Sequence, residues 1–129
     1  MAATSVQVER PTIEGLNDPL HFSNAVTIEG GKMVHLSGML SPEGDLGAQL
    51  KGVYDKLKIG LAGCGASPSD VIRQLVFVVD LVPEHRELVL AAMGEFYEAA
   101  RPASTLVGVA ALIIAGALVE IDVTAAIDG

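Results

Sequence analysis

Residues 101–109 read Arg-Pro-Ala-Ser-Thr-Leu-Val-Gly-Val, and residues 118–122 read Leu-Val-Glu-Ile-Asp. Pro102 ends the helical pattern before it, because proline lacks the amide hydrogen that a helix interior requires. The apolar residues on either side of an Ala-Gly pair predict strands over residues 105–112 and 117–126, joined as a hairpin. This stretch therefore predicts a C-terminal pair of strands that follows a helix.

Two amphipathic helices with a strand between them are predicted upstream. Asp45 can cap the first helix, which two glycines, Gly63 and Gly65, bring to an end. Pro83 suits the first turn of the second helix. Residues 71–81 are almost continuously apolar, as in a strand covered on both faces. The apolar positions at helical spacing are Leu46, Leu50, Val53, Leu57 and Leu61 in the first helix, and Val89, Met93, Phe96 and Ala100 in the second.

The N-terminal part supplies the remaining strands. Residues 25–29 and 33–39 are β-prone runs separated by Gly-Gly-Lys, which is typical of a hairpin, and a further strand is expected around residues 5–9. The predicted order is β-β-β-α-β-α-β-β in one α+β domain over residues 1–129. Right-handed crossovers place both helices on one face of a single mixed sheet. Because the other face would expose a large apolar patch, we expect the chain to self-associate.

Composition narrows the classes of partner. The formal net charge is −8 and the eight lysines and arginines are scattered, so we expect no nucleic-acid partner. No apolar run reaches the roughly 18 residues of a membrane-spanning helix, and the first residues lack the pattern of a signal peptide. The single cysteine, Cys64, cannot form an internal disulfide, which fits a reducing compartment. We therefore expect a cytoplasmic protein without a membrane partner.

Several motifs resemble those of the Rid family, the reactive intermediate deaminases that are also called YjgF-like. Residues 102–105 resemble the family's Pro-Ala-Arg-Ser/Thr, and residues 119–121 match its Val-Glu-Ile. Residues 22–26 resemble its Tyr-Ser-x-Ala-Val segment, and residues 36–38 resemble its Ser-Gly-Gln strand end. The resemblance implies a chorismate-mutase-like homotrimer with small-molecule clefts between subunits. It also implies hydrolysis of an imine or enamine with release of ammonia, and we expect no cofactor.

The chain departs from the family pattern at substrate-binding positions. Ser104 stands where the family has the arginine that binds a substrate carboxylate, and it offers only one neutral hydrogen bond in its place. Phe22 replaces the tyrosine, Met39 the glutamine and Leu90 an asparagine of the family. We therefore expect a ligand that is neutral or more apolar than the family's small imino acids. Arg101 would substitute for the missing arginine only if the local backbone differed from the family's.

Glu120 is the candidate catalytic residue. In the family, the matching glutamate is thought to position the hydrolytic water. If Glu120 lines a cleft between subunits with Phe22, Leu90 and Leu106, desolvation would favour its protonated form and suit it to proton transfer near neutral pH. The alternative is a carboxylate facing solvent on an ordinary strand. Strand alternation places Leu118, Glu120, Asp122 and Thr124 on one face, and Val119, Ile121 and Val123 on the other.

The remaining reactive side chains are few. His35 shares a strand face with Ser37 and could act as an acid, base or donor near the cleft, or serve as a structural histidine. Three histidines without helical pairing or cysteine partners predict no metal site. Cys64 follows a helix, whose dipole disfavours a thiolate there, so we expect no nucleophile.

Three functions remain open on this basis. The first is a Rid-like enzyme acting on an enamine or imine, with Glu120 as the acid, base or water-orienting group. The second is an enzyme for proton transfer, cyclisation or hydrolysis of an apolar pathway intermediate. The third is a non-catalytic trimer that binds a ligand or a partner. RNA cleavage is disfavoured by the acidic charge and the sparse aromatic residues.

Overall fold

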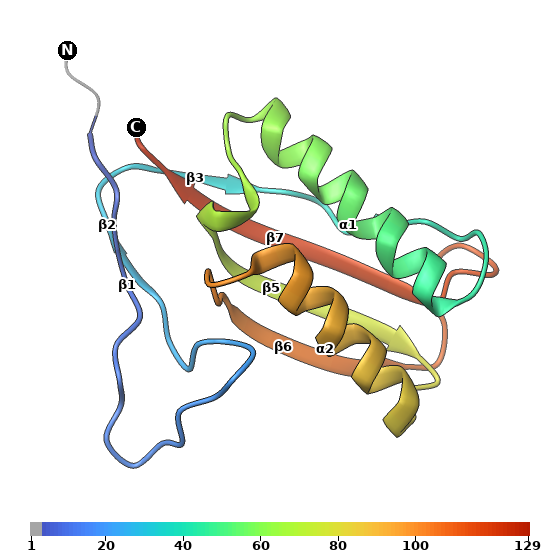
Figure 1. The fold of residues 1–129 in the computed structure, drawn as a ribbon. Coiled ribbons are helices and arrows are strands. Elements are labelled where there is room, and N and C mark those ends of the chain that lie inside the picture. Colours follow the sequence, from blue (N-terminus) through green and yellow to red (C-terminus); the bar gives the residue numbers. More distant parts are fainter. Residues whose placement is uncertain (1–3) are drawn as a thin grey trace.

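A mixed β-sheet with two helices packed against one face forms the body of the molecule (Figure 1). The computed structural model describes residues 4–129. The main sheet has the order β3 (Lys32–His35), β7 (Val119–Ile127), β5 (Val71–Val79) and β6 (Ala103–Val109), and a short strand, β4 (Met39–Leu40), also pairs with β7. Only β5 and β6 run parallel; the other pairs are antiparallel. The predicted α+β class is confirmed, with both helices on one face.

The two helices begin where the sequence predicts. Helix α1 (Leu46–Gly63) follows Asp45, whose side chain accepts a hydrogen bond from the Ala48 amide. Helix α2 (Pro83–Tyr97) starts with its proline in the first turn, where the missing amide hydrogen is not needed. It ends at Tyr97, short of Pro102, because Glu98 takes a left-handed backbone with φ of 52°. Neither helix is long and apolar enough to cross a membrane within residues 4–129.

The predicted C-terminal hairpin is wrong. Strands β6 and β7 are consecutive in the chain, but β5 lies between them and pairs with both. The nearly continuous apolar character of β5 explains its central place, since such a strand needs partners and cover on all sides. Strand β6 therefore lies at the edge of the sheet.

The predicted N-terminal hairpin is also wrong. Strand β2 (Thr27–Glu29) pairs with β1 (Gln7–Glu9) in a separate two-stranded arm, visible at the left of Figure 1, whereas β3 joins the main sheet. Gly30 and Gly31 between them have φ of 72° and 73°, and an added Cβ on Gly31 would collide with the carbonyl oxygen of Ile127. The Gly-Gly pair thus turns the chain tightly over the end of β7 instead of closing a hairpin.

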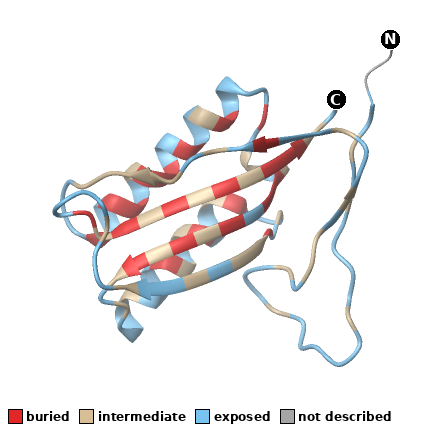
Figure 2. Cartoon of the chain, turned by 180° about the vertical axis from the view of Figure 1, so that it is seen from behind, coloured by how far each residue is buried: buried red, intermediate tan, exposed pale blue. Residues whose placement is uncertain are grey.

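The hydrophobic core fills the space between the helices and the sheet. Each of its largest aliphatic side chains contributes about 1.5–3 kcal/mol through removal from water. They are Val53, Leu57 and Leu61 of α1, Val71, Val76 and Val78 of β5, Val89 of α2, and Val119, Ile121 and Val123 of β7. Figure 2 looks onto the opposite face of the sheet, which no helix covers. This uncovered face carries the alternate residues of each strand.

Candidate functional site

Glu120 lies on the uncovered face of the sheet. The strand register places it beside Phe77 of β5 and Leu40 of β4. Its side chain lies against Gly38, where an added Cβ would come within 2.9 Å of the carboxyl carbon. Glu120 is half-buried, and no side chain of residues 4–129 forms an ion pair or hydrogen bond with its carboxylate. The carboxylate therefore rests between two apolar side chains and remains available to a ligand.

His35 shares this face but lies away from Glu120. Its Nδ1 is 3.2 Å from the hydroxyl oxygen of Thr124, its register partner on β7. Thr124 is four residues along β7 from Glu120, which corresponds to about 13 Å. Ser37 is exposed, in the link between β3 and β4 where the predicted strand 33–39 is interrupted. Within residues 4–129, no three His, Cys, Asp or Glu side chains gather as a metal site would require.

Ser104 lies on the opposite, helix-covered face. The parallel register pairs it with Gln74, which is fully buried beneath the helices. Leu106, two residues further along β6, shares this face, and Leu90 of α2 also packs against the core there. The sheet therefore separates Ser104 and Leu106 from Glu120 within one chain.

A buried polar cluster holds the Ser104 side chain. The hydroxyls of Tyr54 and Tyr97 donate to Oε1 of Gln74 over 3.2 and 2.8 Å, and Nε2 of Gln74 donates to the Ser104 hydroxyl over 3.0 Å. Burial raises the pKa of both tyrosines well above the ordinary value of 10.0, so both remain protonated. This cluster was not predicted from the sequence, although Gln74 is conspicuous as a lone amide in a largely apolar strand.

The other sequence-predicted residues are divided between the two faces and the N-terminal loop. Met39 pairs with Ile121 and packs against the core on the helix side, so it does not share the face of Glu120. Phe22 is 36% exposed and precedes Ser23, whose amide donates to the Pro102 carbonyl over 3.0 Å at the start of β6. Phe22 therefore lies at the same end of β6 as Ser104.

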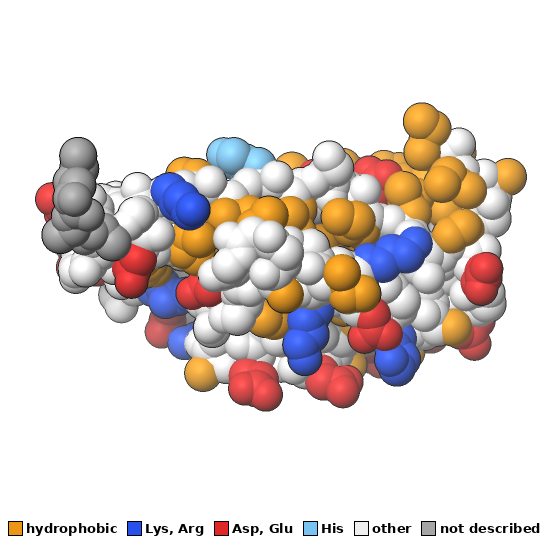
Figure 3. Space-filling model, turned by 90° about the horizontal axis from the view of Figure 1, so that it is seen from above, with side chains coloured by type: hydrophobic (Ala, Val, Ile, Leu, Met, Phe, Trp, Pro, Cys, Tyr) orange, Lys and Arg blue, Asp and Glu red, His pale blue; other side chains and the backbone are white. Residues whose placement is uncertain are grey.

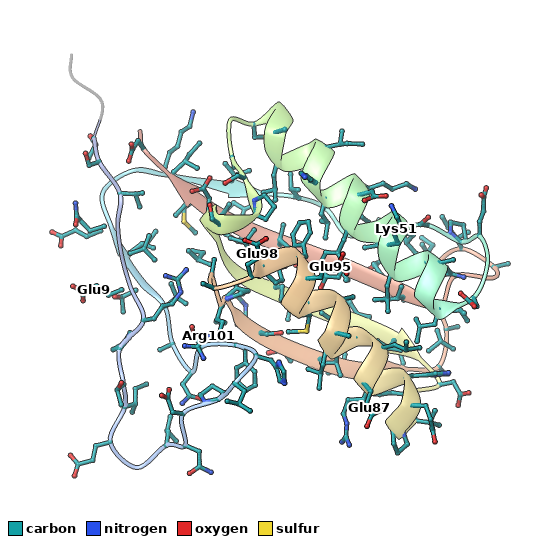
Figure 4. The ribbon with its side chains drawn as sticks, in the orientation of Figure 1. Glu9, Lys51, Glu87, Glu95, Glu98 and Arg101 are labelled. Atoms are coloured by element: carbon teal, nitrogen blue, oxygen red, sulfur yellow. The ribbon has the colours of Figure 1, made fainter. Side chains whose placement is uncertain are left out.

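Arg101 serves the N-terminal loop. Its Nη1 donates to the carbonyl oxygens of Pro19 and Leu20 over 3.1 and 3.4 Å, and its own carbonyl accepts from Nε of Arg10 over 3.2 Å. Figure 4 shows Arg101 beside this loop. Because the guanidinium is engaged there, Arg101 is poorly placed to take the role expected of an arginine at position 104.

Arg73 is a residue of the uncovered face that the sequence analysis overlooked. It is exposed, and it is paired with Thr124 on one side and Ala103 on the other. It is the only charged residue of β5, which is the signal that could have identified it. In the register, Asp122 lies between Arg73 and Glu120 on this face. A ligand carboxylate bound at Arg73 would therefore be repelled by the Asp122 carboxylate.

A groove of about 680 Å³ lies on the other side of the molecule, between α1 and α2. Tyr54 and Phe96 line it, with Lys51 of α1 and Glu95 of α2, which Figure 4 shows on the two helices. It includes none of the sequence-predicted site residues. The candidate residues around Glu120 thus lie on an open surface of the single chain.

The sequence profile of the family described as Endoribonuclease L-PSP matches residues 14–127. The chain belongs to this family. Among solved structures, the Rid protein YyfB from Yersinia pestis is 33% identical, with a TM-score of 0.82 over 95% of this chain and 99% of that one. Rv2704 from Mycobacterium tuberculosis, of the YjgF/YER057c/UK114 family, is 31% identical, with a TM-score of 0.70 over 82% and 86% of the two chains. The fold expected for a Rid protein is confirmed.

A curated relative of this Rid protein is Protein DfrA of Myxococcus xanthus. The two chains are 38% identical over 112 residues, which cover 81% of this chain and 83% of DfrA. Ser104, at the position where the sequence resemblance places an arginine, is hydrogen-bonded to Gln74 of the same chain.

Proposed function

We propose that this Rid protein is an enzyme that acts on an enamine or imine in a cleft between two subunits. The observation that carries the proposal is the half-buried carboxylate of Glu120, on an uncovered sheet face and against a glycine that makes room for it. A carboxylate without an ion-pair or hydrogen-bond partner among residues 4–129 is free to exchange a proton with a bound ligand or water.

The cleft needs two chains. Glu120 and Ser104 lie on opposite faces of the sheet, so no pocket of a single chain can contain both. Apolar side chains such as Leu75, Phe77 and Val107 share the face of Glu120, and packing them against another subunit would remove them from water. In a homotrimer, one subunit would supply Glu120 and the next would supply the edge strand β6 with Ser104 and Leu106.

The proposed reaction is hydrolysis of the C=N bond. Glu120 accepts a proton from a water molecule as the water oxygen bonds to the imine carbon, and it passes this proton to the nitrogen, which gives an amino alcohol. Glu120 then accepts the hydroxyl proton as the C=O bond forms and gives it to the nitrogen as the C–N bond breaks. Ammonia and a carbonyl product leave, and the carboxylate is regenerated unchanged. For an enamine, the same carboxylate would first transfer a proton to the carbon.

The experiment is the rate of ammonia release from the imine that an amino-acid oxidase generates from leucine. We expect the protein to accelerate release, and Glu120→Gln to lower the acceleration by roughly 10²- to 10⁴-fold, the usual contribution of a positioned acid or base. Asp122→Asn, which removes the neighbouring carboxylate of the same face, is the matched control and should keep most of the activity. Equal acceleration by wild type and Glu120→Gln would refute the proposal, as would no acceleration by wild type.

The second candidate is a non-catalytic trimer that binds a ligand or a partner. One observation favours it. Ser104, at the position of the expected substrate-binding arginine, has no charge to offer a ligand and is hydrogen-bonded to Gln74. Activity that is absent in wild type, together with a biological effect that survives Glu120→Gln, would support it. Cleavage of RNA is not proposed, because the net charge is −8 and the face in Figure 3 mixes basic with acidic side chains.

A further inference from the structure

The amide of Gln74 has one favourable orientation. Two tyrosine hydroxyls reach it from α1 and α2, and both are protonated donors at neutral pH because burial raises their pKa. With Oε1 facing the tyrosines, both protons find an acceptor. In the opposite orientation one tyrosine hydroxyl could still donate to the other, but at least one buried hydroxyl proton would lack an acceptor among residues 4–129, at the cost of an unsatisfied polar group.

This orientation also fixes the polarity of the next hydrogen bond. Since Oε1 of Gln74 is occupied by Tyr54 and Tyr97, the side that faces Ser104 is the NH₂ group, which can only donate. The Ser104 oxygen therefore accepts the internal bond. Its own proton has no acceptor in residues 4–129. A ligand that accepts this proton completes the chain of hydrogen bonds, whereas a ligand that only donates leaves the proton unsatisfied.

We infer that the Tyr54–Gln74–Tyr97 cluster sets Ser104 as a hydrogen-bond donor, so that the site selects ligands with a neutral acceptor oxygen. The preferred substrate would carry an amide, ester or ketone carbonyl where the family is expected to bind a carboxylate, and the leucine-derived imine would be a slower substrate. Gln74 and the two tyrosines act through Ser104 and are positioning residues. The inference rests on the proposed function, because it requires that Ser104 face the ligand in the cleft.

The test compares two five-membered rings of similar size, cyclopentanone as an acceptor and pyrrole as an N–H donor. Their dissociation constants are taken from the amide shifts of Ser104 and Thr105 in ¹H–¹⁵N NMR titrations of the intact protein. Wild type should bind cyclopentanone about three- to tenfold more tightly than pyrrole, the usual contribution of one hydrogen bond. Ser104→Ala should abolish this preference.

Tyrosine-to-phenylalanine variants separate polarity from packing. Tyr54→Phe or Tyr97→Phe alone leaves one hydroxyl to orient Gln74, so each single variant should keep the preference. The double variant retains both aromatic rings but frees the amide to turn, and its preference should fall to about one. Thermal melting and ¹H–¹⁵N spectra would show that the fold of each variant is intact.

Two results would overturn the inference. One is equal binding of the two probes at Ser104 in wild type, or no binding there at all. The other is an unchanged preference in the double variant. These readouts do not involve turnover, so a protein that fails to release ammonia from imines but shows the acceptor preference would refute the proposed reaction and keep this inference.

Discussion

Gly38 leaves space for the carboxyl group of Glu120. A side chain at position 38 would occupy the place of the Glu120 carboxyl group, whose Cδ and Oε2 both lie 2.9 Å from an ideal Cβ. Leu40 and Phe77 flank the same group in the register. The glycine of the Leu36-Ser37-Gly38 segment thus has a steric explanation. Gly38 lies in the link between β3 and β4, and it leaves room there for the side chain of Glu120 on β7.

Gly38→Ala should therefore lower activity without unfolding the protein. The new methyl group meets the flexible end of a side chain, so the free energy of unfolding should change by less than about 1 kcal/mol. The displaced carboxylate should slow ammonia release by roughly 10²-fold, as expected for a catalytic group moved by about 1 Å. Gly94→Ala in α2 adds the same methyl group where no atom beyond the adjacent helix backbone lies within 4 Å, and it should leave the rate unchanged. Equal rates for wild type and Gly38→Ala would contradict the placement of Glu120.

At the scale of residues, the sequence correctly predicted the sheet face of some side chains. Simple alternation was enough to place Glu120 and Asp122 on the face opposite Ile121, and the structure confirms it. The internal partner of Ser104 could not be predicted, because Gln74 lies 30 residues away and meets it only through the parallel register. Alternation within one strand also does not reveal which residues of a neighbouring strand lie on the same face of the sheet.

At the scale of elements, local signals predicted the helices and failed for strand neighbours. Asp45 and Pro83 mark helix starts through interactions within one turn. Strand pairing depends on distant segments, so consecutive strands were joined as hairpins in the prediction. The structure instead inserts β5 between β6 and β7 and pairs β2 with β1. Because strand pairing could not be predicted from local signals, the division of the candidate residues between the two sheet faces could not be predicted either.

The tyrosine cluster ties both helices to β5, and its ionisation provides a test. Burial raises the folded-state pKa of Tyr54 and Tyr97 above the unfolded value near 10, so their contribution to stability is constant below about pH 10. As the pH rises further, only the unfolded state ionises. The free energy of unfolding should then fall by about 1.4 kcal/mol per pH unit for each tyrosine.

Absorbance at 295 nm reports this directly, because these are the two tyrosines of a chain without tryptophan. Phenolate absorbance should appear only as the far-ultraviolet circular dichroism is lost. The Tyr54→Phe/Tyr97→Phe variant should show a flatter dependence of stability on pH above 10. Phenolate formation near pH 10 in the still folded protein would show that the cluster is not buried.

At the scale of the whole molecule, the uncovered sheet face is the surface through which the proposed trimer would form. Val107 on this face is 38% exposed in the single chain, and Leu75 and Phe77 lie beside it in the register. Together they form an apolar surface next to Glu120, which is visible as the helix-free side in Figure 2. Burial of this surface between subunits would stabilise the trimer and exclude water from the cleft.

Val107→Asp should therefore convert the proposed trimer to a folded monomer and abolish the proposed activity at the same time. Ile59→Asp is the matched control, because Ile59 is 73% exposed on α1 and lies away from the uncovered face. Light scattering coupled to size exclusion gives the mass of each variant. A trimer that persists in Val107→Asp would place the interface on another surface.

Mixing of subunits tests the central claim that one active site takes Glu120 from one chain and Ser104 from another. The Glu120→Gln and Ser104→Asp chains are unfolded, mixed in equal amounts and refolded together, and ammonia release is measured. Each chain alone should be inactive. The Glu120→Gln chain lacks the acid and base, and the Ser104→Asp chain places a charge in an apolar cleft. In the mixture, random assembly should restore about a quarter of the wild-type activity, because some interfaces join two intact halves. A mixture that forms mixed trimers but remains as inactive as either variant alone would contradict the account.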